Sequence, residues 1–192
     1  MKNKHILLWV LFILALLMIS ADAKIETGAG ISYGFINNFK MWTGQGTDVG
    51  NVLQVDYFVK PIESYKAALD IGFVADNNVL NSVSAPTYVE TGAYLNIKNY
   101  FYLKKSGATA TYVSLGTGLY GVDLWWKLNN HFYSQSTNIF ADLSAGAGLD
   151  INMKNLVLNM DISFPALIHT WYDQAKLPYI VSFGGKCKFD LF

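Results

Sequence analysis

Residues 157–164 read VLNMDISF and follow directly after Leu156. From 156 to 164, leucine, methionine, isoleucine or phenylalanine fills every even position, whereas valine, asparagine, aspartate and serine fill the odd ones. A β-strand places alternate residues on opposite faces. This stretch therefore has one wholly apolar face and one polar face with Asp161 near its centre. The fold depends on which of the two faces points inward.

The same period-two alternation recurs along the rest of the chain, and no segment between the strands has the pattern of an amphipathic helix. The sequence predicts eight strands, at residues 25–36, 52–60, 65–75, 87–103, 110–120, 139–153, 156–164 and 179–192.

Every charge in these segments lies on the face opposite the apolar one, and that polar face is rich in glycine and serine. We expect such a face to be too small to fill a hydrophobic core. A soluble sandwich or barrel needs a bulky apolar inner face, whereas a membrane barrel is apolar outside and polar inside. The sequence thus predicts an all-β, eight-stranded antiparallel up-and-down transmembrane β-barrel, in which residues such as Leu158 face lipid and Asp161 faces the interior.

The connections between the predicted strands alternate in length. Those at 37–51, 76–86, 121–138 and 165–178 are long, and those at 61–64, 104–109 and 154–155 are short. Long outer loops and short inner turns are typical of bacterial outer-membrane barrels, and an even strand number closes the sheet without an edge in lipid. We expect both termini and the short turns to be periplasmic.

The first 23 residues have the pattern of a cleaved signal peptide. Lys2 and Lys4 precede an apolar run at 6–19, and Ala21-Asp22-Ala23 is a small-x-small site. The run is shorter than the roughly 20 residues that a membrane helix needs. The predicted domains are therefore a signal peptide over 1–23 and a barrel over 24–192, located in the bacterial outer membrane.

Composition excludes several classes of function. Only 15% of residues are charged while 52% are hydrophobic, against about 25% charged in typical soluble domains. Cys187 is the sole cysteine, so there is no internal disulfide and no cysteine metal cluster. Arginine is absent and the net charge is near zero, which argues against nucleic-acid binding. No cofactor is predicted.

Three runs carry a family resemblance: YVSLGTGLYGVD at 112–123, NIFADLSAGAGLDINMKNLVLNMDISF at 138–164 and FGGKCKFDLF at 183–192. They resemble the outer-membrane protein A/X-like superfamily of small eight-stranded outer-membrane β-barrels, and the likeness spans the predicted barrel. The last strand departs from that family, because Asp190 stands where a third-last aromatic residue is usual. The resemblance implies barrel assembly machinery as a partner, with outer-membrane lipid and lipopolysaccharide around the barrel.

The predicted interior charges form the first candidate site. An eight-stranded barrel is just wide enough for its own side chains, so we expect a plug of ion pairs and water; a narrow passive channel is the alternative. We expect Asp161 and Lys186 to share one ion-pair network and Glu26 to meet Lys188. The predicted interior charges are Glu26, Asp56, Lys60, Lys66, Asp70, Glu90, Lys98, Asp142, Asp150, Asp161, Lys186 and Lys188.

The second candidate site lies in and beside the predicted outer loops. Its residues are Trp42, Trp125, Trp126, His131, His169 and Trp171. Aromatic belts are normal at both interfaces of a membrane barrel, and we expect the inner belt to hold Tyr57, Tyr65, Tyr100, Phe101 and Phe189. The remaining interpretation is binding of a host surface or extracellular ligand by the loop at 121–138.

Enzymatic activity is an alternative that the resemblance suggests. Some small outer-membrane barrels are lipid A-modifying acyl hydrolases or acyltransferases with serine and histidine at the outer rim. The deacylase pattern His-x-Ser-Asn does not occur at His169, which is followed by Thr170, Trp171 and Tyr172. We therefore predict no catalytic residues and a non-enzymatic role in envelope integrity or surface interaction through the outer loops.

Overall fold

The computed structural model describes residues 25–37, 49–76, 87–128, 131–169, 175–176 and 178–190, and their regular secondary structure is entirely β-strand. No helix in these ranges is long and apolar enough to cross a membrane. The predicted signal peptide lies outside the described residues. The strands are β1 (Glu26–Asn37), β2 (Val49–Ile62), β3 (Tyr65–Asp76), β4 (Thr87–Ser106), β5 (Thr109–Leu128), β6 (His131–Met153), β7 (Leu156–His169), β8 (Ala175–Lys176) and β9 (Tyr179–Asp190).

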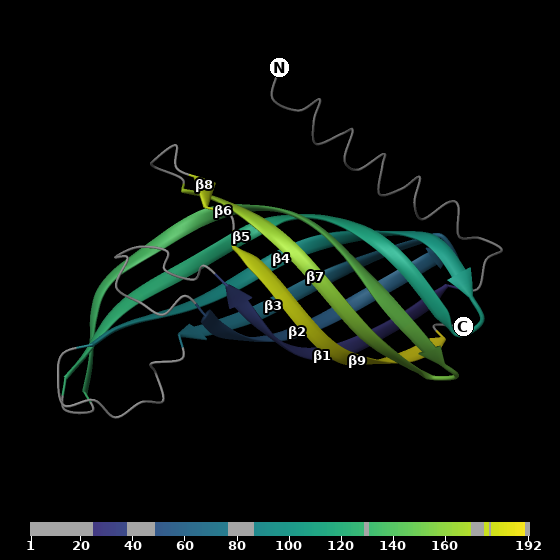
Figure 1. Ribbon diagram of the computed structural model, residues 1–192, viewed down its shortest axis with the longest axis horizontal. Coiled ribbons are helices and arrows are strands. Elements are labelled where there is room, and N and C mark those ends of the chain that lie inside the picture. Colours follow the sequence, from purple (N-terminus) through teal and green to yellow (C-terminus); the bar gives the residue numbers. More distant parts are fainter. Residues whose placement is uncertain are drawn as a thin grey trace, which may run out of the picture.

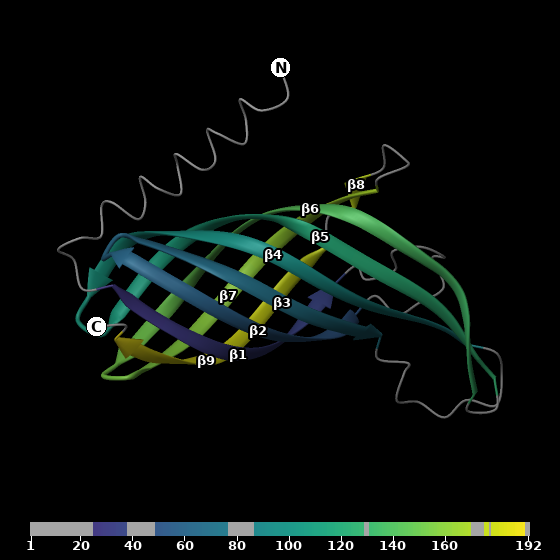
Figure 2. The same ribbon diagram turned by 180° about the vertical axis from the view of Figure 1, so that it is seen from behind.

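Eight long strands form a closed antiparallel ring. Strands that follow one another pair from β1 through β7, and β9 lies between β7 and β1. The two-residue strand β8 pairs only with residues 167–168 of β7 and is not part of the ring. Figure 1 shows β7 and β9 on the near wall, and Figure 2 shows β2, β3 and β4 on the opposite one. The predicted eight-stranded up-and-down barrel is confirmed.

The two ends of the barrel differ in their connections. Two-residue turns at 63–64, 107–108 and 154–155 join strands at one end, here called the turn end. The opposite end, where β1 leads to β2 and β5 to β6, is called the loop end. Gly107 has a φ of 59°, which glycine adopts without the steric cost of a Cβ. The short connections fall where the sequence predicts them.

The pairing registers give the ring a fixed stagger. A row of directly paired residues leaves β7 at residue 157 and, after passing round the barrel, returns to β7 at residue 167. The stagger and the tilt of barrel strands are linked, so this offset sets the height of each inward side chain. The row consists of Val157, Lys186, Gly30, Asp56, Asp70, Asn96, Gly118, Asp142 and Leu167.

The apolar face of each strand points outward. On β7, Met160 and Phe164 are 48% and 49% exposed, whereas Asp161 on the other face is 6% exposed. The same alternation holds round the ring, for example at exposed Ile97 and buried Lys98 on β4. The stretch at 156–164 therefore points its apolar face out of the barrel, as predicted, and the apolar belt has the form that lipid requires.

All four predicted outer loops overlap strands: those at 37–51 and 76–86 only at their ends, and those at 121–138 and 165–178 over longer stretches. The hairpin of β5 and β6 stays paired as far as Leu128 and His131, with one irregularity between Leu124 and Trp125. The prediction of a loop over 121–138 is therefore wrong for 121–128 and 131–138, and the loop predicted from 165 is strand as far as His169. Figure 1 shows β5 and β6 running past the other strands at the loop end. Alternating hydrophobicity marks only the part of a strand that faces lipid. Beyond that part the sequence pattern ends, although the backbone pairing of the two strands continues.

The inner face also builds an apolar core, contrary to the expectation from its small residues. The loop-side cluster consists of Ile36, Val52, Val74, Tyr94, Tyr120, Val122, Phe140 and Ile180. The turn-side cluster consists of Phe58, Ala68, Tyr100 and Tyr112. Tyr100, assigned above to the inner aromatic belt, is 2% exposed and lies inside the barrel.

Glycines make room for these inward tyrosines. Gly72 pairs directly with Tyr94, and Gly148 with Tyr112. A Cβ at either glycine would collide with the facing tyrosine. The alternation of small and large side chains on neighbouring strands therefore fills the interior.

Met160→Lys and Met153→Lys test the outward belt with the same substitution. Both methionines are 48% exposed, but Met160 lies in the middle of β7 and Met153 lies at the turn end of β6. Lysine costs about 2–4 kcal/mol at the midplane of a bilayer and about 0–1 near its surface. We expect Met160→Lys to lower the free energy of unfolding in lipid vesicles by the larger amount. Equal losses would show that the belt is not in lipid.

Candidate functional site

Three buried ion pairs between described side chains cross the interior of the barrel. In each pair both side chains are 7% exposed or less. A buried charge is tolerated when it is paired and hydrogen-bonded, so these contacts decide whether the interior can hold its charges. The pairs are Lys186–Asp56 at 2.9 Å, Lys98–Asp161 at 2.7 Å and Lys66–Asp150 at 3.1 Å, each measured from Nζ to Oδ2.

Tyrosines complete these ion pairs, and sequence reasoning missed them. The Tyr112 hydroxyl donates to Asp161 Oδ1 at 3.0 Å, and the Tyr102 hydroxyl donates to Asp150 Oδ2 at 2.5 Å. The Lys66 ammonium lies 4.2 Å from the centre of the Tyr100 ring, a cation–π contact. The signal was present for Tyr100 and Tyr102, which alternate in step with Lys98 on β4, and for Tyr112, which lies on the same face of β5 as the small residues Ser114 and Gly116.

Asp161 and Lys186, which are predicted to share one ion-pair network, do not pair with each other. Lys186 pairs across the ladder with Val157, and Asp161 pairs with Ser182. Their heights differ because β9 runs past the start of β7, where the Lys188 amide donates to the Asn155 carbonyl at 2.8 Å. Each charge therefore has another partner, Asp56 for Lys186 and Lys98 for Asp161.

Two buried aspartates have no lysine at ion-pair distance among the described residues. Asp70 stands directly opposite Asp56 on the neighbouring strand and is 2% exposed. Asp142 accepts a hydrogen bond from Asn96 at 2.7 Å. Like charges that face each other across a ladder destabilise it, so the Asp70 carboxylate opposite Asp56 lowers the stability of the barrel.

The turn end carries a further set of charges. Glu26 accepts from Lys188 at 3.3 Å, as predicted, and both side chains are partly exposed. The Lys60 ammonium lies 4.8 Å from the centre of the Tyr102 ring. These residues line a cavity of about 530 Å³ that opens at the turn end.

Two further cavities between described side chains are small. One of about 20 Å³ lies beside Asp70 and Asn96, and one of about 10 Å³ beside Lys66 and Asp150. A water molecule needs about 10–15 Å³ by this measure. Each cavity therefore has room for about one water. The stacked rings of Tyr94 and Tyr120, whose centroids are 5.6 Å apart, belong to the loop-side cluster.

The predicted outer residues are only partly described. Trp42 and Trp171 lie outside the described residues, as do the side chains of Glu90, Trp125, Trp126 and His169. The backbones of Trp125 and Trp126 lie in β5, where they pair with Ser134 and Tyr133 of β6. His131 is exposed at the start of β6.

In the described part of the chain, no group of three or more histidine, cysteine, aspartate or glutamate side chains could hold a metal ion. Cys187 is exposed on the outer face of β9.

Asp56→Asn and Lys186→Met should each destabilise the barrel, because each leaves a buried charge without its partner. The loss for such a pair is about 3–5 kcal/mol, and hydration lowers it. The double variant should cost less than the sum of the two. Unfolding by urea in lipid vesicles measures all three.

Asp70→Asn is the matched control for Asp56→Asn, because Asp70 has a carboxylate neighbour and no paired lysine. It should leave stability unchanged or raise it. Purely additive costs for Asp56 and Lys186, or an equal loss for Asp70→Asn, would contradict the pairing.

Comparison with known proteins identifies the fold. No protein-family model and no curated protein sequence matches the chain. Three solved structures of small outer-membrane barrels match the chain with 12–14% identity. Neisserial surface protein A (NspA) has 12% identity and a TM-score of 0.54, over 86% of this chain and 97% of its own. Yersinia pestis Ail, in complex with the heparin analogue sucrose octasulfate, has 13% identity and a TM-score of 0.56. The match covers 86% of this chain and 99% of the Ail chain.

A third structure has the same architecture. The N-terminal β-barrel domain of Pseudomonas aeruginosa OprF has 14% identity and a TM-score of 0.50, over 85% of this chain and 97% of that domain. Each match spans nearly the whole of the compared structure. The chain therefore has the fold of the small eight-stranded outer-membrane β-barrels.

Proposed function

We propose that this protein is an integral outer-membrane barrel without enzymatic activity, which acts at the cell surface through its loop end. The proposal rests on one observation: the barrel combines an apolar outer belt that suits lipid with a filled interior. A barrel of this kind offers no route through its centre, so its working surface is the part outside the membrane.

The filled interior argues against the alternative of a narrow passive channel. A solute would have to pass the loop-side cluster, in which Ile36 and Val52 are fully buried and Tyr120 is 1% exposed. Nearer the turn end, the solute would then meet the Lys98–Asp161 and Lys186–Asp56 ion pairs. Breaking a buried pair is costly, so passive conduction through this layer is unfavourable.

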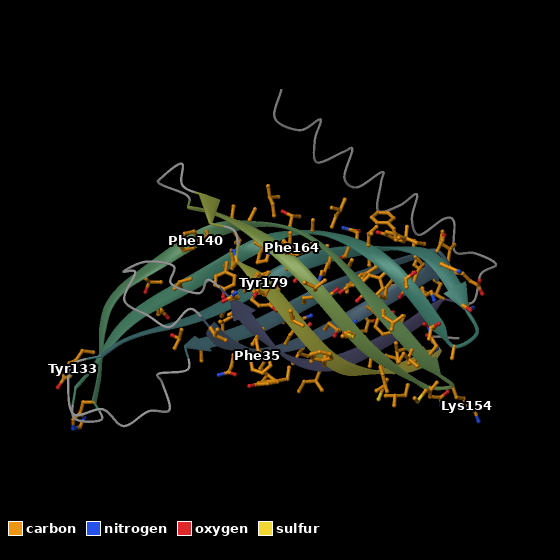
Figure 3. All side chains as sticks on the ribbon, in the orientation of Figure 1. Phe35, Tyr133, Phe140, Lys154, Phe164 and Tyr179 are labelled. Atoms are coloured by element: carbon orange, nitrogen blue, oxygen red, sulfur yellow. The ribbon has the colours of Figure 1, made fainter. Side chains whose placement is uncertain are left out.

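The extended hairpin of β5 and β6 supports a role for the loop end. Figure 3 shows Tyr133 far beyond Phe140 along this hairpin, while Lys154 marks the turn end. Tyr133 is 45% exposed, and the Thr137 hydroxyl donates to Asp123 at 2.6 Å across the two strands. Paired strands hold aromatic side chains in place at a lower entropic cost than a free loop does.

The partner that suits this surface is a host surface or another extracellular ligand. Ail, which shares the fold, was solved in complex with a heparin analogue, so a barrel of this fold can bind such a ligand. Lipopolysaccharide and outer-membrane lipid would surround the belt, and the barrel assembly machinery would insert it. No observation favours a lipid A-modifying acyl hydrolase or acyltransferase.

Surface labelling tests the proposed orientation. In a Cys187→Ser background, Asn130→Cys at the loop end should react with a membrane-impermeant maleimide on intact cells. The matched variant Asn155→Cys, in the β6–β7 turn, should react only after the outer membrane is opened. Labelling of Asn155→Cys alone on intact cells would place the turn end outside and refute the proposal.

A further inference from the structure

The cavity at the turn end is large enough for a small molecule. Its volume is about 530 Å³, within the usual range for ligand pockets. It lies where the ends of β1, β2, β4 and β9 meet, and it is open to solvent at the turn end. The mouths of β-barrels are common places for ligand sites.

The charges that line this cavity do not balance. Glu26 is paired with Lys188 at 3.3 Å, and Glu63 with Lys105 at 3.4 Å. The third lysine, Lys60, has no carboxylate at ion-pair distance among the described residues, although Glu26 is its direct partner in the β1–β2 ladder. Glu26 thus stands between two lysines and pairs with only one. Among the described side chains that line it, the cavity carries one positive charge in excess.

The surroundings of Lys60 keep its ammonium in the cavity. It lies 4.8 Å from the centre of the Tyr102 ring, a contact that favours the cation. The Tyr102 hydroxyl donates a hydrogen bond to Asp150 Oδ2 at 2.5 Å, and this bond fixes the position of the ring. Lys60 is therefore positioned as a donor for an incoming anion.

The geometry points to a binding site for a small organic monocarboxylate, such as the free carboxyl end of a short peptide, with Lys60 as the group that receives the carboxylate. One negative charge neutralises the excess, whereas a phosphate group carries more than one at neutral pH. Pro61, Ile62 and Ala110 supply apolar wall beside the ammonium. This inference concerns the turn end and is independent of any ligand at the loop end.

Binding of N-acetyl-alanyl-alanine to the refolded, full barrel in detergent micelles tests the site. Backbone amide shifts of Ile62 and Ala110 report binding at the cavity itself. We expect saturable shifts with the free acid and at least about tenfold weaker binding of the C-terminal amide, which lacks the charge. Inorganic phosphate, as a separate titrant, should bind more weakly than the acid.

Variants assign the binding to one side chain. Lys60→Met keeps the apolar stem and should weaken binding of the acid at least about tenfold, while Lys60→Arg should retain it. Lys104→Met is the matched control, because Lys104 is an exposed lysine on β4 that does not line the cavity. The proposal is overturned if no saturable shift occurs, if acid and amide bind alike, if phosphate binds more tightly, or if Lys60→Met binds as the unaltered barrel does.

Discussion

Closure of the sheet is the constraint on which this structure depends. A strand in lipid must satisfy its backbone N–H and C=O groups within the protein, and the pairing of β9 with both β1 and β7 leaves the ring without an edge. Closure is compatible with only certain staggers. Once the row from residue 157 returns at residue 167, the height of every interior side chain follows.

The charge pairs are a consequence of that stagger. Among the buried side chains of the described residues, five aspartates stand against three lysines: Asp56, Asp70, Asp142, Asp150 and Asp161 against Lys66, Lys98 and Lys186. The stagger gives each lysine one aspartate, and tyrosine and asparagine donors supply further hydrogen bonds. The excess of acid is concentrated at Asp70 and Asp142, inside a barrel whose packing leaves little room for water.

The sequence predicts which face of the sheet a residue lies on better than it predicts which side chains contact each other. Parity alone was enough to place Met160 outside and Asp161 inside, because a strand has only two faces. It could not pair Lys186 with Asp56, since that contact depends on the offset between strands that are far apart in the chain. The expected contact of Lys186 with Asp161 does not form, because the ends of β7 and β9 are not level.

Two further differences have a common cause. Tyr100 was assigned to a lipid belt because aromatic residues are frequent there, although its parity is that of Lys98 and the interior. The hairpin beyond Gly121 was predicted as a loop because its residues lose the apolar alternation. In both cases the expectation followed residue type, whereas the structure follows the backbone ladder.

The most direct measurement of the central claim, that the interior is filled, is the conductance of the purified barrel in planar lipid bilayers. The packed loop-side cluster and the three buried ion pairs predict a membrane that stays at its baseline current after the barrel has inserted, with insertion verified by its resistance to protease. Stable, stepwise conductance of uniform size from the same preparation would show an open path and would contradict the account.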